Sequence, residues 1–234
     1  MNPRLSVVMP VYNEAGTIRQ IVERVLAVPV PKELIVVDDG STDGTAEALG
    51  RLQGEQPDRI RVIRHERNRG KGAAIRTALP HVRGEVVLIQ DADLEYNPAE
   101  YPKLIEPILA GDADVVYGSR FLGGPHRVLY FWHRLGNGLL TLLTNLCADL
   151  NLSDMETGYK VFRAEILKSI PLRSDRFGFE PEVTLKAAKL QCRIYEVPIS
   201  YRGRDYAEGK KITWRDGARA VLTILRFSIW NDLK

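Results

Sequence analysis

The chain has 234 residues, 44% of them apolar, which is enough to bury the core of one domain with a small appendage. A formal net charge of +3 is too small to indicate a nucleic-acid partner. No apolar run reaches the ~18–20 residues of a membrane-spanning helix, and no basic and then apolar leader opens the sequence, so we expect a cytoplasmic protein.

The first half of the chain alternates between two hydrophobic periods. Apolar runs typical of buried strands are followed by segments with helical spacing, and short links join them. This alternation predicts an α/β fold with a mostly parallel sheet, whose ligand crevice lies beyond the carboxyl ends of the strands. The expected strands are Leu5–Met9, Glu33–Val37, Ile60–Ile63, Glu85–Ile89 and Ala113–Tyr117, and the expected helices are Thr17–Leu26, Gly44–Leu52, Lys71–Leu79 and Pro98–Leu109.

The second half is less regular. A helix is expected near residues 132–150, with leucines on one face and polar residues on the other. A second small α/β part follows, with strands Tyr159–Arg163 and Arg193–Val197 around a helix Glu180–Leu190. The chain then carries an amphipathic segment, Trp214–Trp230, with arginines opposite its apolar side. Cys147 and Cys192 show no ligand-like spacing, and we expect reduced packing residues.

Polar turns follow the first two expected strands. In residues 10–14, Tyr12 offers a ring for stacking on a base and Glu14 offers an acceptor, although this turn could simply open the next helix. In residues 37–41, two adjacent aspartates exceed what helix capping requires. An aspartate at such a strand end can hydrogen-bond a base or a ribose, so this turn indicates nucleotide binding.

The run Val86–Asp93 carries the strongest chemical signal. An apolar strand ends there at two carboxylates, Asp91 and Asp93, that are one residue apart. Mg²⁺ and Mn²⁺ prefer oxygen ligands, and Mg²⁺ usually takes one or two carboxylates together with substrate phosphates. Glu95 could add a ligand. The run therefore predicts a Mn²⁺ or Mg²⁺ site that holds a diphosphate, with two helix-capping acids as the alternative.

Two further segments carry positive charge. Residues 68–74 resemble a phosphate-cradling turn at a helix N-terminus, where Lys71 could bind a phosphate or a ribose or be merely solvated. Residues 201–211 form a basic stretch ahead of the amphipathic segment. Arginine suits phosphate recognition, so the two features together indicate an anionic group near an apolar surface, with a solvated face as the alternative.

Taken in order, these segments resemble the inverting family 2 glycosyltransferases with the GT-A fold. The likeness is greatest to the dolichol-phosphate mannose synthase and polyprenyl-phosphate glycosyltransferase group. It runs from Leu5 to about Ile212, and it implies a glycosyltransferase domain at 1–212. Independently of the likeness, the basic amphipathic pattern at 213–234 indicates an interfacial helix, with ordinary core packing or dimerisation as the alternative. The Asp-Met-Glu-Thr-Gly turn at 154–158 differs from the form in the better-known mannosyl enzymes, so the sugar stays open.

The resemblance implies roles for particular residues on the nucleotide side. Asp93 would be the main metal ligand, Asp91 would face the nucleotide sugar, and Glu95 stands where family members often have glutamine. The residues that would hold the nucleotide sugar are Pro10, Tyr12, Glu14, Val37, Asp39, Asp91, Ala92 and Asp93.

On the acceptor side, Gly118-Ser119-Arg120 matches a family segment whose arginine serves the acceptor phosphate or the transferring sugar. Arg134 would be its partner arginine, and Asp154 and Glu156 belong to the acceptor-side acidic turn. Arg204 and Lys210 fit the basic loop over the phosphates, with Lys211 as the alternative to Lys210.

The resemblance implies transfer of a hexosyl unit from a nucleotide diphosphate to a polyprenyl or dolichyl phosphate, with inversion. A phosphate monoester, whose second pKa is near ~6, is already largely ionised at neutral pH and needs no strong general base. The alternatives are a soluble enzyme acting on a hydroxyl, for which Asp154 or Glu156 would have to accept a proton, and a nucleotidyltransferase. The expected partners are the nucleotide sugar, the lipid phosphate and a membrane surface; a homo-oligomer stays open.

Overall fold

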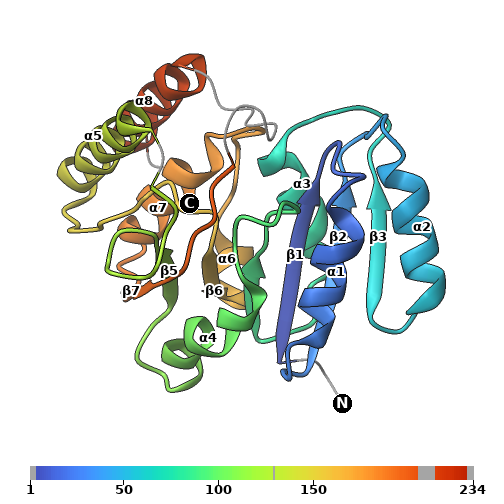
Figure 1. Ribbon diagram of the computed structural model, residues 1–234. Helices are drawn as coiled ribbons and strands as arrows, with labels where there is room; N and C mark the ends of the chain where they lie inside the picture. Colours follow the sequence, from blue (N-terminus) through green and yellow to red (C-terminus); the bar gives the residue numbers. More distant parts are fainter. Residues whose placement is uncertain (1–3, 129, 205–213, 231–234) are drawn as a thin grey trace.

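A computed structural model describes residues 4–128, 130–204 and 214–230 (Figure 1). Its centre is a seven-stranded sheet in the order β3-β2-β1-β4-β6-β5-β7. Only β6 runs antiparallel to its neighbours β4 and β5, and the other pairs are parallel, so the predicted mostly parallel sheet is confirmed. The strands are β1 (Leu5–Val11), β2 (Lys32–Asp38), β3 (Ile60–Arg64), β4 (Val86–Ile89), β5 (Val115–Ser119), β6 (Lys160–Arg163) and β7 (Ile194–Pro198).

The two strands after residue 158 do not form a second small α/β part, as the sequence had suggested. β6 lies between β4 and β5, and β7 extends the same sheet beside β5. The reason lies in the strand sequence: Val161 and Phe162 are fully buried on opposite faces and pair with strands of the first half. The described residues therefore form one sheet with an apolar core on each of its two faces.

Helices cover both faces of this sheet. One apolar cluster joins alternate strand residues, such as Val7 and Met9, to α1 (Ile18–Ala27), α2 (Thr45–Glu55) and α4 (Tyr101–Leu109). The other cluster joins the intervening residues, such as Val8, to α3 (Lys71–Ala78), α6 (Ala164–Ser169) and α7 (Phe179–Lys189). This division follows from the two-residue repeat of side chains along a strand. Two 3₁₀ turns, η1 (Leu79–His81) and η2 (Pro98–Glu100), complete the connections.

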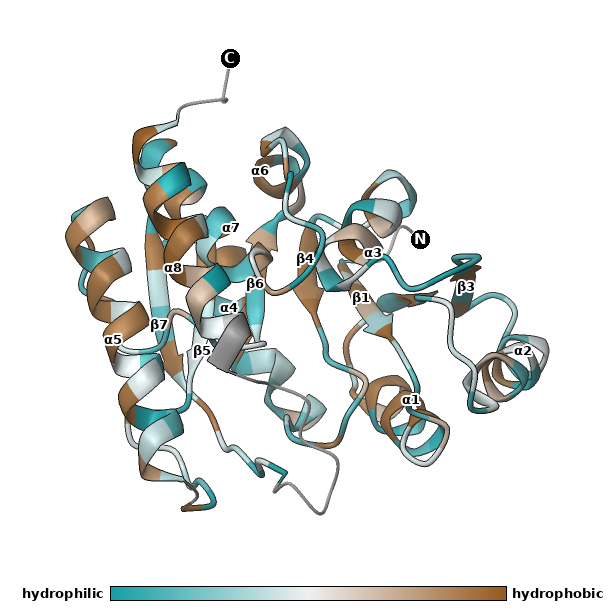
Figure 2. Ribbon diagram, turned by 90° about the horizontal axis from the view of Figure 1, so that it is seen from above, coloured by the Kyte–Doolittle hydropathy of each residue, from teal (hydrophilic) through white to brown (hydrophobic). Residues whose placement is uncertain are grey.

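Two long helices, α5 (Phe131–Ala148) and α8 (Trp214–Ile229), lie side by side outside α7 (Figures 1 and 2). The amphipathic pattern expected for α5 is present, but its polar face points inward: Thr141 and Thr144 are buried. Leucines of the other face are exposed, and Figure 2 shows the hydrophobic residues along this helix. None of the helices in the described ranges is long and apolar enough to cross a bilayer.

Candidate active site

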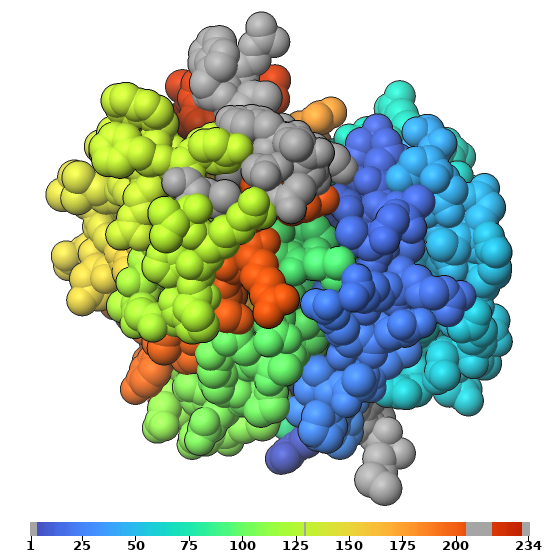
Figure 3. All heavy atoms as spheres, viewed as in Figure 1, coloured from blue at the N-terminus to red at the C-terminus, as the bar shows by residue number. Residues whose placement is uncertain are grey.

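The polar segments singled out in the sequence meet at one edge of the sheet. β1, β2, β4 and β5 all end there, and the antiparallel β6 begins there, so the turn at residues 154–158 arrives at the same edge. A cavity of about 820 Å³ opens between these ends. On the face seen in Figure 3, the segment before residue 204 (orange) lies between the N-terminal part (blue) and the segment that leads into α5 (yellow-green).

Asp91 lies two residues after the end of β4 and lines the cavity. Its Oδ1 lies 2.8 Å from Nζ of Lys71, the first residue of α3, and that ammonium is also 2.9 Å from Oε1 of Glu180. Burial opposes the charged form of Lys71, but Asp91 and Glu180 hold its pKa above the usual value. Gly158 is needed beside this pair because a Cβ there would collide with Oδ2 of Asp91. Lys71 thus bridges two acids of the site rather than lying in solvent.

Asp93 belongs to an acidic cluster that a single arginine neutralises in part. Nη2 of Arg204 lies 3.0 Å from Oδ2 of Asp93 and 3.2 Å from Oε1 of Glu14. Glu95 accepts hydrogen bonds from the Tyr201 hydroxyl (2.8 Å) and from the backbone N–H of Arg204 (2.7 Å). Burial, together with the charges of Glu95 and Asp91, raises the pKa of Asp93 to about 8, against the effect of Arg204. When all of these acids are ionised, they carry more negative charge than Arg204 offsets, so further positive charge would stabilise the ionised form.

The three carboxylates expected to bind metal do not converge in the described part of the chain, where no group of three acidic, histidine or cysteine side chains has metal-site geometry. Asp91 faces Lys71, while Glu95 is turned toward Tyr201 and Arg204. The donor set still fits a hard cation that takes one or two carboxylates and completes its shell with phosphate and water. Asp93 and Asp91 would hold such an ion, with Glu95 as an outer contact.

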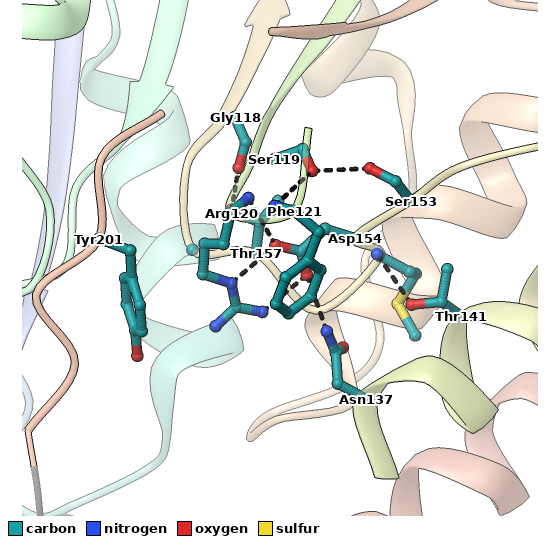
Figure 4. A network of polar contacts seen from close by, with 12 residues as sticks. Gly118, Ser119, Arg120, Phe121, Asn137, Thr141, Ser153, Asp154, Thr157 and Tyr201 are labelled. Atoms are coloured by element: carbon teal, nitrogen blue, oxygen red, sulfur yellow. Dashed lines mark hydrogen bonds and ion pairs between the residues drawn. The ribbon is translucent and has the colours of Figure 1, made fainter. Parts of the chain in front are cut away.

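Arg120, which lines the cavity, forms a paired unit with Asp154 (Figure 4). Nε and Nη2 of Arg120 each lie 2.7 Å from one oxygen of Asp154, and the Arg120 backbone N–H and Asn137 Nδ2 also donate to this carboxylate. Burial alone would raise the pKa of Asp154, but Arg120 and the other donors hold it below the usual value. A fixed bidentate pair of this kind orients the guanidinium toward the cavity.

Glu156 differs from Asp154 two residues earlier. Its Oε1 is buried and has no hydrogen-bond partner among the described residues. Burial and the neighbouring Glu180 raise its pKa to about 8, while Lys160 and Arg120 oppose the shift. Lys160 itself is buried, with a pKa lowered to about 8 by burial, and it donates to the carbonyls of Met155 and Thr157. Lys160 thus fixes the shape of the turn that carries Glu156.

The residues predicted to hold the nucleotide divide into two groups. Pro10, Tyr12 and Glu14 line the cavity, as does Ala92. Val37 instead lies in the core, fully buried. Asp39 is buried and accepts hydrogen bonds from the backbone N–H groups of Arg69 (2.9 Å) and Gly70 (2.7 Å). Its Oδ1 also lies 2.6 Å from Nδ1 of His65. Asp39 therefore organises the turn ahead of α3, which presents Lys71.

One predicted phosphate contact, Arg134, is not among the described residues that line the cavity. Arg134 is exposed on α5, and its guanidinium carbon lies 3.9 Å from the centre of the Phe121 ring. Lys210 and its alternative Lys211 lie outside the described residues. Sequence reasoning missed Glu180, Lys160 and Tyr96: Glu180 and Lys160 belong to an expected helix and an expected strand that were interpreted as packing elements, and Tyr96 follows the acidic turn without a charge of its own. The available signal was a charged residue, such as Glu180, at the start of an expected buried helix.

Comparison with protein families gives a direct match: the model named glycosyl transferase family 2 covers residues 6–170. The undecaprenyl-phosphate mannosyltransferase of Micrococcus luteus is 31% identical, over 99% of this chain and 98% of its own length. The low-salt glycan biosynthesis hexosyltransferase Agl6 of Haloferax volcanii is 32% identical over 95% of this chain, which spans 53% of that relative.

Solved structures are similar as well. The crystal structure of glucosyl-3-phosphoglycerate synthase from Mycobacterium tuberculosis matches with a TM-score of 0.76 and 25% identity, over 98% of this chain and 82% of that one. A complex of that enzyme with Mn²⁺, UDP and glucosyl-3-phosphoglycerate matches with a TM-score of 0.71. These matches confirm the expected GT-A fold.

Proposed function

The chain belongs to glycosyl transferase family 2 and is a glycosyltransferase, and we propose that it transfers a hexosyl unit from a nucleotide diphosphate sugar to a polyprenyl phosphate. One observation carries this proposal: the same cavity is lined by Asp91 and Asp93 and by Arg120, whose guanidinium is paired with Asp154. The two aspartates can hold a metal-bound diphosphate, and Arg120 can orient an anionic acceptor. The similarity to the Micrococcus luteus mannosyltransferase, over nearly the full length of both chains, supports a lipid phosphate acceptor.

A bound Mn²⁺ or Mg²⁺ would offset the charge that develops on the departing diphosphate. Asp93 and Asp91 would hold this ion, and its presence in the similar Mycobacterium tuberculosis enzyme supports the assignment. Arg204 lies against Asp93 and Glu14, so it can turn toward the phosphates when a cation enters the cluster. Tyr12 and Pro10 would contact the nucleoside.

The lipid phosphate acceptor has to be positioned, but it does not need a general base to remove a proton. An oxygen of the lipid phosphate attacks the anomeric carbon, the bond from that carbon to the diphosphate oxygen breaks, and the configuration inverts. Because the phosphate is largely ionised at neutral pH, Arg120 has only to orient and partly neutralise it. Asp154 holds Arg120 in that orientation through two hydrogen bonds of 2.7 Å.

The exposed faces of α5 and α8 support contact with a membrane surface. Trp132 and Leu146 of α5 are each 75% exposed, and Ile229 of α8 is 86% exposed. Trp132 also lines the cavity, so the apolar face is continuous with the site entrance. Arg219 and Arg226 are exposed on α8, and a basic amphipathic helix suits an anionic interface. We propose peripheral attachment to the cytoplasmic face of a membrane, with residues 213–234 as its interfacial part.

A second candidate is transfer to a hydroxyl of a small molecule, which the similarity to glucosyl-3-phosphoglycerate synthase favours. One assay separates the two. Purified protein is incubated with GDP-mannose, UDP-glucose or UDP-N-acetylglucosamine, Mn²⁺, and either a short polyprenyl phosphate or 3-phosphoglycerate. We expect glycolipid and release of a nucleoside diphosphate with the first acceptor. Turnover with 3-phosphoglycerate alone would establish the second candidate instead.

The metal assignment is tested by Asp93→Ala. We expect transfer to fall roughly 100-fold or more, the range typical of losing one electrostatic contact at an active site. Thermal denaturation of the variant provides the control for folding. Wild-type turnover by a folded Asp93→Ala variant would exclude Asp93 as the main metal ligand.

A further inference from the structure

Two carboxylates in the cavity have no task in the diphosphate or acceptor chemistry. Glu180 comes from the first turn of α7, and Glu156 comes from the turn ahead of β6; both line the cavity. They lie close enough that Glu180 perturbs the ionisation of Glu156. Buried acids are rare unless they are paired or functional, so this pair calls for an explanation.

Glu180 is held on one side only. Its side chain is 5% exposed, and its Oε1 is fixed by Lys71 at 2.9 Å. Its Oε2 is buried without a hydrogen-bond partner in the described ranges of the chain. Lys71 also contacts Asp91 at 2.8 Å, so the position of Glu180 is tied to the acid that faces the expected nucleotide sugar.

Glu156 presents a matching acceptor. Its Oε1 is likewise buried and lacks a partner among the residues that the structure describes. A buried polar atom without a hydrogen bond costs free energy, and native proteins rarely leave one unless water or a ligand completes it. Two such oxygens at one cavity therefore indicate a ligand with hydrogen-bond donors.

The charges around the pair narrow the class of ligand. A phosphate would be repelled by the carboxylate of Glu180, and cationic neighbours are already in place, since Lys71 contacts Glu180 and Lys160 lies beneath the Glu156 turn. An uncharged group with several O–H donors satisfies both oxygens without adding charge. A hexose is such a group, and a hexose on a diphosphate held near Asp93 would lie within this cavity.

We propose that Glu180 and Glu156 bind hydroxyl groups of the transferred hexose, and that Lys71 fixes Glu180 for this task. The inference rests on the proposed function and deepens it, because it assigns sugar recognition to α7 and to the acidic turn. It makes these two residues determinants of which hexose is accepted.

The test compares the affinity for a nucleotide sugar with that for the bare nucleoside diphosphate. Isothermal titration with Mn²⁺ is carried out for GDP and GDP-mannose, and for UDP and UDP-glucose, on the full chain. The ratio of the two affinities measures the contribution of the sugar. For Glu180→Gln we expect this contribution to fall about tenfold or more, the range for a hydrogen bond to a charged group, and for Glu156→Gln about fivefold, the range for a hydrogen bond between neutral groups. Nucleoside diphosphate affinity should change less than about twofold in both variants.

Glu182→Gln is the matched control. Glu182 also lies buried on α7, but it faces away from the cavity and accepts from the backbone N–H groups of Arg173 and Ser174. Its loss should lower the melting temperature and leave the sugar contribution unchanged. An equal loss for sugar and bare nucleotide in Glu180→Gln would mean that Glu180 only positions Lys71 and Asp91, and this would overturn the proposal.

Deoxygenated donors keep the test decisive even if Glu180→Gln fails to fold. Wild-type protein should lose affinity when one hydroxyl of the hexose is removed, and Glu156→Gln should be insensitive to at least one such removal. If Glu156→Gln lost as much affinity as wild type on removal of each hydroxyl, Glu156 would not bind a hydroxyl of the hexose. If wild-type protein bound and transferred a hexose while the variants kept the full sugar contribution, the inference would fail and the proposed function would stand.

Discussion

At the scale of single residues, two neighbouring acids with the same chemistry titrate differently because their partners differ. Asp154 receives four hydrogen bonds, two of them from the Arg120 guanidinium, and its pKa lies below the usual value. Glu156, buried near Glu180 and with an unpartnered oxygen, has its pKa raised to about 8. Asp154 is therefore suited to orienting Arg120, and Glu156 has an oxygen that can accept a hydrogen bond from a ligand.

This contrast predicts a pH dependence of stability. Between pH 4.5 and about 8 the folded protein keeps a proton on Glu156 that the unfolded chain has released, so stability falls as pH rises through this window. Glu180, Asp154, Lys160 and Arg120 surround the group and stay unchanged in Glu156→Gln. We expect the melting temperature of this variant to fall less between pH 5 and pH 8 than that of wild type. Parallel profiles would show that Glu156 titrates normally.

At the scale of elements, α5 shows how packing can reverse the usual meaning of an amphipathic pattern. Its polar residues face the protein because they serve the site: Asn137 donates to Asp154, and Thr141 accepts from the backbone N–H of Met155. Its leucine face is left exposed beside the exposed residues of α8. An apolar face of this size on the outside is typical of an interaction surface.

The exposed face of α5 predicts membrane binding. Leu142→Glu combined with Leu146→Glu places charge on side chains that are 53% and 75% exposed, so folding should be little affected. Each leucine loses its burial in the interface, and we expect affinity for anionic liposomes to drop at least about tenfold in a sedimentation assay. Leu109→Glu, on the exposed end of α4, is the control. Unchanged sedimentation of the double variant would exclude this face as the attachment surface.

At the scale of the whole molecule, β6 joins the two halves of the chain. Phe162 on this strand is fully buried in the apolar cluster that also holds residues of α3, α7 and α8. Because α5 and α8 pack through α7 onto the same cluster, the two long helices belong to the same cooperative unit as the sheet.

Phe162→Ala tests this unity. Removing a buried ring costs about 3–5 kcal/mol, which corresponds to a drop of roughly 6–20 °C in melting temperature. All three tryptophans, Trp132, Trp214 and Trp230, lie in or next to α5 and α8, so their fluorescence reports these helices while far-UV circular dichroism reports the whole fold. We expect both transitions to shift together. A fluorescence transition that stayed at the wild-type temperature would separate the helices from the sheet.

The sequence by itself determined the strand and helix order and most of the acidic and basic segments that line the cavity, because strand periodicity and polar strand ends are local properties. The family likeness added the expected chemistry, and the family match confirmed that the chain is a family 2 glycosyltransferase. Tertiary structure alone decided what those side chains face. β6 runs antiparallel to its neighbours and brings residues 154–158 to the carboxyl edge of the sheet. Lys71 bridges Asp91 and Glu180. Asp39 accepts hydrogen bonds from the backbone of the turn ahead of α3. Such pairings depend on distances between elements far apart in the chain, and no local pattern encodes them.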